Sequence, residues 1–393
     1  MSSKKKITIL GVTGSIGQST MDVILSAPDL FDVQALSANS NVTHLAEAAI
    51  KLQAKQAVIA DKTQEAALQD LLKSYDIEVL SGAQSIQDVA CVPVDLVMAA
   101  IMGFAGLRPI LRALEQGTNV AIANKEPLVA AGALIMETAR KKNAKILPVD
   151  SEHNAIFQVF EEHNRPAIDK LILTASGGPF LNWSIEDIAR ATPAQAVAHP
   201  NWTMGKKISV DSATMMNKAL EIIEAVHLFD IPCDMIDVLI HPQSTIHSMV
   251  SYIDGSILSQ MGASDMHTPI AYALAWPDRM ESSGNKLDLK TLSTLTFQPP
   301  DFEKFPALSY AYKCIDIGQG ACIALNAANE VAVDQFLRGK IGFSDIMRSV
   351  AYAVDELYPK MSGVALKTVE DIEELDNTVR QAVKHHNQVI ARE

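Results

Sequence analysis

The sequence lacks the features that mark secreted, zinc-binding and membrane-spanning proteins. Its four cysteines are scattered without a CxxC pair, so neither a disulfide framework nor a zinc site is predicted. The longest apolar runs, such as Leu96 to Met102, are too short to span a membrane. The first ten residues hold three lysines but no apolar core or cleavage site of a signal peptide. We therefore expect a cytoplasmic protein without a membrane partner.

Positive charge is also scarce. The chain has 33 Lys and Arg against 46 Asp and Glu, and a formal net charge of −13, which opposes nucleic-acid binding. Its 48% hydrophobic and 20% charged residues are typical of a folded globular protein, and 393 residues predict two or three domains. An anionic small-molecule substrate would need locally concentrated cations and backbone N–H donors.

Short apolar strands alternate with amphipathic helices over residues 1–150. Helical periodicity is present at 19–28, 42–53 and 63–75. The predicted strands are 6–12, 31–38, 56–61, 77–82, 94–101, 119–125 and 144–150. This alternation predicts an α/β fold with an N-terminal, Rossmann-like parallel sheet.

The rest of the chain has a different pattern. Residues 151–285 mix helices and strands, and include a predicted hairpin at 247–262 that turns at Asp254-Gly255. Residues 286–312 contain a double proline and are predicted to be a linker, and 313–393 are predicted to be an α-helical domain. We therefore expect a central α/β domain and a C-terminal helical domain after the parallel sheet.

A glycine-rich turn follows the first predicted strand. Gly11, Gly14 and Gly17 would let backbone N–H groups approach a pyrophosphate at the start of a helix. The spacing is GxxGxxG rather than GxGxxG, so a tight turn without a ligand is the alternative. Residues 37–41, at the end of the second strand, contain no acid that would repel a 2′-phosphate. This favours NADP(H) over NAD(H).

The stretch "LPVDSEHNAIFQ" (147–158) places two carboxylates where a strand gives way to a helix. One interpretation is a helix start with Ser151 as the N-cap and Glu152 beside the helix dipole. The other is a hard-cation site formed by Asp150 and Glu152. Lys125 also ends a predicted strand, and ligands of parallel sheets bind at the carboxyl ends of strands, which favours the site.

A second polar constellation lies at 198–226. Residues 210–226 read as one helix capped near Ser212, with a polar stripe of Thr214, Asn217, Lys218 and Glu221. A narrow stripe suggests a helix directed into a site, although Lys218 and Glu221 could be an exposed ion pair. The preceding residues 198–208 contain Pro, Trp and Gly, and are predicted to be either a mobile lid or an ordinary loop.

These segments together resemble the 1-deoxy-D-xylulose 5-phosphate reductoisomerase family. The resemblance is carried by "GVTGSIGQST", "ANKE", "PVDSEHNAIFQ", "TASGGPF", "HPNWTMGKKISVDSATMMNKALE", "HPQSTIHSMV" and "LNAANEVAV", in order from about residue 5 to 385. It implies rearrangement of this ketose phosphate and its reduction by NADPH to 2-C-methyl-D-erythritol 4-phosphate, in non-mevalonate isoprenoid synthesis. It also implies a bound Mg²⁺, Mn²⁺ or Co²⁺ and a homodimer.

The resemblance further implies which residues form the site, with 1–150 as the NADPH-binding domain and 151–285 as the catalytic and connective domain. The implied metal ligands are Asp150, Glu152 and Glu221, and Lys125 and His199 join them as catalytic residues. The implied substrate-binding residues are Ser151, Glu152, Ser176, His199, Trp202, Ser212, Asn217, Lys218, Glu221 and His247. The implied cofactor-binding residues are Thr13, Gly14, Ser15, Ile16, Asn39, Asn41, Asn124, Lys125, Glu126 and Gly205.

Two other functions compete with this one. A different metal-dependent Rossmann dehydrogenase would explain the glycines and carboxylates, but it leaves no role for the polar residues of 212–218. An NADP-sensing or scaffolding protein would keep the glycines and usually lose catalytic groups, whereas no expected ligand is missing here.

Overall fold

The structure is a computed structural model that describes residues 4–202, 204–361 and 366–390. The chain divides into two compact units, each described here by itself. Unit 1 comprises Met1–Pro127, Ala133–Phe157 and Asp265–Lys286. Unit 2 comprises Leu128–Gly132, Gln158–Ser264 and Leu287–Glu393.

Unit 1 is built on a seven-stranded sheet of order β4-β3-β2-β1-β5-β6-β7. Every neighbouring pair is parallel, as the alternation of strands and helices predicted. The strands are β1 (Lys5–Leu10), β2 (Phe31–Ala38), β3 (Gln56–Ile59), β4 (Glu78–Ser81), β5 (Leu96–Ala99), β6 (Asn119–Ile122) and β7 (Ile146–Pro148). The order reverses between β1 and β5, which makes their carboxyl ends the topological switch point.

Helices connect these strands, and their apolar residues form the core with the sheet. They are α1 (Ser15–Ser26), α2 (Val42–Lys51), α3 (Glu65–Leu72), α4 (Ala83–Val89), α5 (Leu107–Glu115), α6 (Glu126–Lys141) and α7 (Ser151–Val159). Short 3-10 turns at Lys62–Gln64 and Phe104–Gly106 precede α3 and α5. α6 is broken at Ala131, whose φ of −141° is not helical, within the stretch where the chain passes from one unit to the other.

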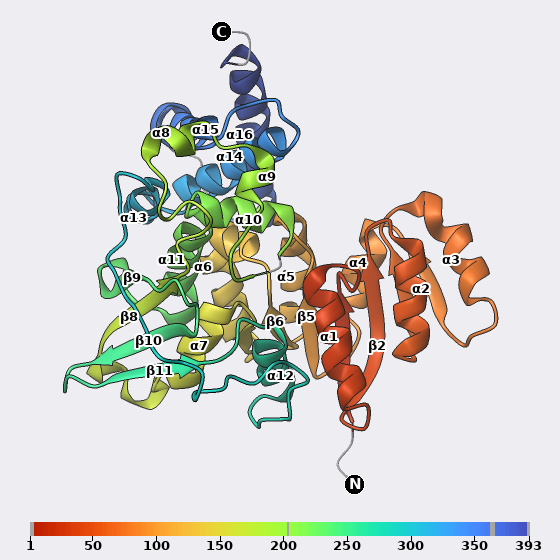
Figure 1. Cartoon of the computed structure of the whole chain (residues 1–393). Helices are drawn as coiled ribbons and strands as arrows, with labels where there is room; N and C mark the ends of the chain where they lie inside the picture. The colour runs from red at the N-terminus through yellow and green to blue at the C-terminus, as the bar shows by residue number, and fades with distance from the viewer. Residues whose placement is uncertain (1–3, 203, 362–365, 391–393) are drawn as a thin grey trace. The chain divides into compact units, whose positions relative to one another are not determined.

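A helix from far along the sequence completes unit 1. α12 (His267–Ala275) packs against α1, as Figure 1 shows for the teal helix beside the red one. The Lys5 ammonium donates to the carbonyl oxygens of Leu274 and Trp276 at 2.8 and 3.1 Å, and so satisfies the carboxyl end of α12.

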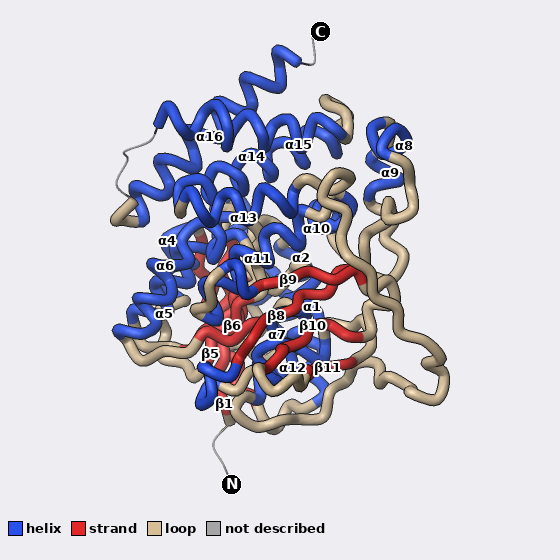
Figure 2. The backbone as a smooth tube through the Cα atoms, turned by 90° about the vertical axis from the view of Figure 1, so that its left-hand side faces the viewer, coloured by secondary structure: helices blue, strands red, loops and turns tan. Residues whose placement is uncertain are grey.

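Unit 2 contains a four-stranded mixed sheet of order β11-β10-β8-β9, seen with its strands side by side in Figure 2. The strands are β8 (Ile168–Ala175), β9 (Ile236–Ile240), β10 (Ile246–Tyr252) and β11 (Ile257–Met261). β10 and β11 form the predicted antiparallel hairpin, with Gly255 at a φ of 88° in its turn. β8 pairs parallel with β9 and antiparallel with β10.

The helices of unit 2 include a C-terminal helical region, which the sequence predicted (Figure 2). They are α8 (Ile185–Ala189), α9 (Pro193–Ala196), α10 (Lys206–Ala213), α11 (Met216–Phe229), α13 (Ala307–Ile317), α14 (Gln319–Leu337), α15 (Ser344–Ala351) and α16 (Val369–Ile390). Shorter helical turns are Glu162–Ala167, Cys233–Met235, Tyr352–Leu357 and Tyr358–Met361. None of the helices in the described ranges is long and apolar enough to cross a membrane.

The prediction of one helix over 210–226 is wrong. The chain forms two helices, because Met215 adopts a left-handed conformation with φ 60° and ψ 11° between α10 and α11. Ser212 therefore lies within the last turn of α10 and does not cap α11. Thr214 belongs to the break, and only Asn217, Lys218 and Glu221 of the predicted stripe lie on α11.

Candidate functional site

In the glycine-rich turn after β1, the backbone lies too close to neighbouring backbone atoms to allow side chains at Gly11 and Gly17. Gly11 has a φ of +88°, and a Cβ there would lie 2.6 Å from the carbonyl oxygen of Ala100. A Cβ on Gly17 would lie 2.4 Å from the carbonyl oxygen of Gly11. Gly14 is the N-cap of α1 and supplies no side-chain cap, so the first backbone N–H groups of α1, at Ser15 and Ile16, are left for an anionic ligand.

The end of β2 holds the residues predicted to meet the 2′-phosphate. Asn39 is exposed, whereas the side chain of Asn41 caps α2 by accepting from the His44 N–H at 3.3 Å. The chain after β3 lies beside Asn39, because the Asp61 backbone N–H donates to the Asn39 carbonyl at 2.9 Å. The Asp61 carboxylate is held by Thr63, which lowers its pKa.

Asn124, just after β6, is hydrogen-bonded through its side chain to the loop that follows β5. Its side-chain N–H donates to the Gly103 carbonyl at 3.1 Å, and this bond identifies the amide nitrogen. A Cβ on Gly106 would lie 2.9 Å from the same nitrogen, so the loop approaches Asn124 closely. The Asn124 Oδ1 atom is buried and has no hydrogen-bond partner in the structure. This oxygen can accept a hydrogen bond from a ligand at the topological switch point.

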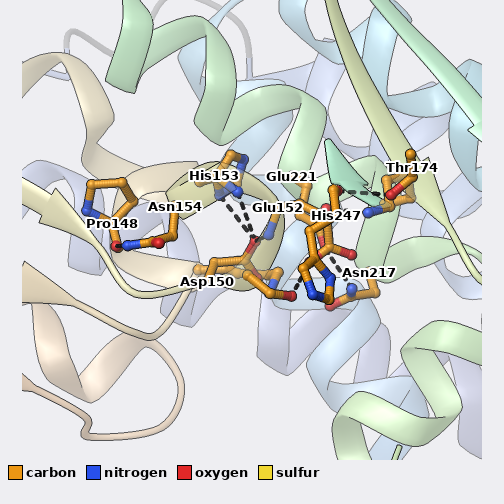
Figure 3. Close-up of polar contacts among 12 residues, drawn as sticks. Pro148, Asp150, Glu152, His153, Asn154, Thr174, Asn217, Glu221 and His247 are labelled. Atoms are coloured by element: carbon orange, nitrogen blue, oxygen red, sulfur yellow. Dashed lines mark hydrogen bonds and ion pairs between the residues drawn. The ribbon is translucent and has the colours of Figure 1, made fainter. Parts of the chain in front are cut away.

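The strand-to-helix junction at Asp150 is a capped helix start, but Asp150 rather than Ser151 provides the cap (Figure 3). Its Oδ1 accepts from the backbone N–H groups of Glu152 and His153 at 3.2 and 3.3 Å. The His153 ring lies 3.4 Å from the same oxygen. Ser151 is the first residue of α7, and its hydroxyl donates to the Glu152 carboxylate. The interpretation with Ser151 as N-cap is therefore corrected.

Lys125 brings a cation to the same junction. It ends the segment after β6, and its ammonium forms an ion pair with the second Asp150 oxygen. Lys125 and Glu126 are each 7% exposed, so both charges lie away from bulk water. Asp150 thus combines helix capping with an ion pair. Unit 1 brings Lys125, Asp150, Ser151 and Glu152 together, as the sequence motifs predicted.

In unit 2 the turn after β8 positions Ser176 against His199. The His199 Nδ1 atom accepts from the backbone N–H groups of Asn201 and Trp202 at 3.1 and 3.0 Å. A neutral His199 ring must therefore carry its proton on Nε2, which donates to the Ser176 hydroxyl oxygen at 2.9 Å. That oxygen also accepts from the Gly178 N–H at 3.1 Å. With its oxygen accepting both bonds, the Ser176 hydroxyl can donate its own proton to an acceptor such as a phosphate oxygen.

The same glycine turn approaches α10. Gly178 has a φ of +66°, and a Cβ there would lie 2.5 Å from the Ser212 carbonyl oxygen. α10 is held from its other side, because Asn329 of α14 donates to the Asp211 carboxylate at 2.9 Å. Lys207 pairs with the second Asp211 oxygen at 2.7 Å. Asn329 and Gly178 were not predicted as site residues, although both lie within motifs that carried the resemblance.

The polar residues of α11 are buried rather than solvent-exposed. Glu221 is 0% and Lys218 3% exposed, and their side chains form an ion pair. Asn217 donates to the other Glu221 oxygen at 2.5 Å (Figure 3). An exposed surface pair, the alternative interpretation, is therefore excluded. Burying these two charges costs desolvation energy, which their mutual attraction and the hydrogen bond from Asn217 help to offset.

The predicted lid residues are placed as follows. Trp202 is half-buried, with its ring 6.1 Å from that of His247. His247 is 7% exposed on β10, and its backbone carbonyl accepts from the Thr174 hydroxyl at 2.7 Å. Gly205 is the N-cap of α10, and Lys206–Ile208 are already helical. Residue 203 of the predicted lid lies outside the described residues.

Family comparisons cover most of the chain. Residues 7–132 match the model described as 1-deoxy-D-xylulose 5-phosphate reductoisomerase, and residues 146–229 match the C-terminal domain model of that enzyme. Residues 261–382 match a further model, the DXP reductoisomerase C-terminal domain. The chain is 49% identical over 380 residues to the reductoisomerase of Zymomonas mobilis, with 97% of each chain covered. It is 50% identical over 377 residues to that of Rhodospirillum centenum, covering 96% of this chain and 93% of the relative.

Solved structures give the same result. The Zymomonas mobilis enzyme in complex with NADPH superposes with a TM-score of 0.91 at 46% identity, covering 98% of this chain and 99% of that one. A DOX-P reductoisomerase in complex with NADPH, fosmidomycin and magnesium superposes with a TM-score of 0.93 at 43% identity, with the same coverage. The chain therefore belongs to the 1-deoxy-D-xylulose 5-phosphate reductoisomerase family.

Proposed function

We propose that the protein is an NADPH- and divalent-metal-dependent enzyme that rearranges and reduces 1-deoxy-D-xylulose 5-phosphate to 2-C-methyl-D-erythritol 4-phosphate. This reaction supplies isoprenoid precursors in the non-mevalonate pathway. The observation that carries the proposal is identity near one half to reductoisomerases over almost the whole chain. The cofactors follow from the related structures, which hold NADPH and magnesium.

Product analysis tests this function. The protein is incubated with the ketose phosphate, NADPH and Mn²⁺, and the carbon skeleton of the product is read by NMR. We expect a branched skeleton with a methyl group on a quaternary carbon. A straight-chain polyol phosphate would instead indicate a simple dehydrogenase, and absence of turnover with intact NADPH binding would favour a sensor.

We propose Asp150, Glu152 and Glu221 as the metal ligands. Each offers a carboxylate oxygen, which is the type of ligand that a hard divalent cation prefers. A bound Mg²⁺, Mn²⁺ or Co²⁺ supplies Lewis-acid polarisation of the substrate oxygens. Lys125 neutralises Asp150 and is the proposed cation beside the reacting oxygens, and Ser151 is proposed to contact substrate.

The phosphate group of the substrate is assigned to unit 2. We propose that Ser176, Ser212, Asn217 and Lys218 bind it, with Lys218 supplying the full positive charge. The support is the donor chain from His199 to Ser176, which leaves the serine O–H to donate outward. The close approach of Gly178 to Ser212 belongs to the same arrangement. His199, Trp202 and His247 complete the proposed substrate pocket.

NADPH is proposed to bind through the glycine turn and the carboxyl ends of β2 and β6. The proposed contacts are Thr13, Gly14, Ser15, Ile16, Asn39, Asn41, Asn124, Lys125, Glu126 and Gly205. Support comes from the uncapped start of α1 and the unpaired Oδ1 of Asn124. The use of the Asn41 side chain as a helix cap makes Asn39 the more available of the two amides.

We also propose a cytoplasmic homodimer. β11 is an edge strand of its sheet, and its side chains Ile257 and Leu258 are 56% and 41% exposed. An edge strand with exposed apolar residues is suited to pairing with a second copy. Sedimentation of the purified protein with Ile257→Lys against the native sequence would test this, since a charge on the edge should favour the monomer.

A further inference from the structure

The loop between β5 and α5 exposes an apolar side chain at the topological switch point of unit 1. Met102 is 79% exposed, the highest value among the large hydrophobic side chains of the described ranges. A large apolar side chain this exposed at the ligand-binding edge of the sheet is available to pack against a bound ligand. Met102 is not among the residues proposed above to bind the metal, the substrate or NADPH.

Contacts on both sides of the β5–α5 loop fix its backbone, and so fix the position of Met102. The Gly11 turn contacts its start, since a Cβ on Gly11 would lie 2.6 Å from the Ala100 carbonyl oxygen. Asn124 holds its far side through the Gly103 carbonyl at 3.1 Å. Gly103 has a φ of 73°, a conformation that disfavours side chains and that turns the backbone directly after Met102.

The position of the β5–α5 loop in the sheet indicates which half of a bound dinucleotide would lie beside Met102. In a doubly wound sheet the strands on either side of the switch point bind the two halves of the dinucleotide. Here β2 and β3 lie beyond β1 on one side, and β6 and β7 lie beyond β5 on the other. With the pyrophosphate at Gly14 and the adenosine 2′-phosphate at Asn39, the nicotinamide half belongs on the β5 side. The unpaired Asn124 acceptor lies on that side too.

We propose that Met102 covers a face of the nicotinamide ring of NADP(H), and that Asn124 positions the loop that carries it. A flexible thioether packs well on a flat aromatic ring, because sulfur is polarisable and the side chain adapts to the ring. Burial of the ring on this face also keeps water from the hydride-transfer position. This inference rests on the proposed NADPH-dependent function and adds a specific residue to it.

Oxidation of Met102 is the test. The full-length protein is treated with dilute hydrogen peroxide, and methionine sulfoxide at Met102 is measured by peptide mass spectrometry. The ligands compared are NADP⁺ and adenosine 2′,5′-bisphosphate, which fills only the adenine half, and calorimetry confirms that each binds. Met280, a half-buried methionine of the same unit, serves as the internal control.

We expect NADP⁺ to slow oxidation of Met102 several-fold, with little change for adenosine 2′,5′-bisphosphate and for Met280. If bound NADP⁺ leaves Met102 unprotected, or if the bisphosphate protects it equally, the inference is overturned while the enzymatic function stands. If NADP⁺ does not bind at all, the proposed function fails and the inference falls with it.

A substitution gives a second measurement. Met102→Ala should weaken NADP⁺ binding roughly two- to tenfold and leave the affinity for adenosine 2′,5′-bisphosphate unchanged, since only the ring contact is lost. Leu71→Ala removes another exposed apolar side chain, on α3 of the same unit, and should change neither. Equal weakening of both ligands by Met102→Ala would contradict a nicotinamide contact.

Discussion

At the scale of single residues, the site depends on buried charges that need partners. An unpaired carboxylate in the interior is costly, and Glu221 is paired with Lys218 and hydrogen-bonded by Asn217. Asp150 is likewise paired with Lys125. A cation joining Glu221 and a phosphate joining Lys218 would each replace part of this pairing, so binding of metal and of substrate phosphate are expected to depend on one another.

Glu221→Gln tests the metal assignment. The change removes one carboxylate charge and keeps the side-chain shape, so Mn²⁺ affinity and turnover should fall by orders of magnitude while the protein stays folded. Mn²⁺ binding by electron paramagnetic resonance and steady-state rates give the two readouts. Glu224→Gln is the matched control, because Glu224 is also buried, at 2% exposure, on α11. Near-native turnover in Glu221→Gln would refute the assignment.

Lys218→Ala tests the phosphate assignment. A charged hydrogen bond contributes roughly 1.5–3 kcal/mol, so KM for the ketose phosphate should rise by about ten- to a hundredfold. Steady-state kinetics measure this, with the melting temperature recorded to detect loss of folding. Lys384→Ala, at an exposed position of α16, should leave KM unchanged. A rise in KM of less than a few fold in Lys218→Ala would argue against phosphate binding there.

At the scale of elements, backbone approach decides how the turn after β8 meets α10. Gly178→Ala adds a Cβ at a φ of +66° and only 2.5 Å from the Ser212 carbonyl oxygen. Gly255 also has a positive φ, +88°, but a Cβ there would have no atom within 4 Å, so Gly255→Ala measures the backbone strain alone. We expect Gly178→Ala to lower the free energy of unfolding by roughly 1–3 kcal/mol more than Gly255→Ala. It should also raise KM.

Urea unfolding and steady-state kinetics of the two alanine variants check this prediction. Equal stability losses and unchanged KM values would show that the approach of Gly178 to Ser212 relaxes without cost.

The segment 198–208 is predicted to close over bound substrate. Trp202 is half-buried against His247, and Gly205 has open space around its Cα, which suits a movable cover. Proteolysis within 198–205 should be fast for the free protein and slow with a hydroxamate phosphonate mimic. Trp202→Ala should lower kcat/KM without loss of Mn²⁺ or NADPH binding. Identical cleavage with and without the mimic would mean that the loop is static.

At the scale of the whole molecule, His227 links folding to pH. Its ring packs against Gly132, where a Cβ would lie 2.2 Å from the ring, and burial lowers the pKa of His227 from 6.5 to about 4. Between these pH values the unfolded chain binds a proton that the folded chain does not. Stability contributed by the neutral ring is therefore present above pH 6.5 and is lost as the pH falls toward about 4.

The expected loss is at most about 3 kcal/mol in the free energy of unfolding across this window. Urea unfolding as a function of pH measures it. His227→Gln should give a flatter profile in the same range, whatever its stability at neutral pH. His385→Gln, at an exposed position of α16, should keep the native profile. A native slope in His227→Gln would contradict the linkage.

The sequence by itself determined the parallel sheet, the hairpin and the C-terminal helical region, because alternation of apolar residues and turn glycines acts over short distances along the chain. It also identified the chemical groups, including Asp150, Lys125 and Lys218, since the motifs keep them together. The predicted limits of the domains and the roles of the site residues stay predictions.

Only the tertiary structure decided features that depend on contacts between distant segments. Among these are the break at Met215, the cap supplied by Asp150 and the approach of Gly178 to Ser212. The attachment of α12 to α1 and the link from Asn329 to Asp211 are further cases, each joining segments more than a hundred residues apart. Local periodicity carries no information about such pairs, because burial, close packing and hydrogen-bond satisfaction are settled only when the elements meet.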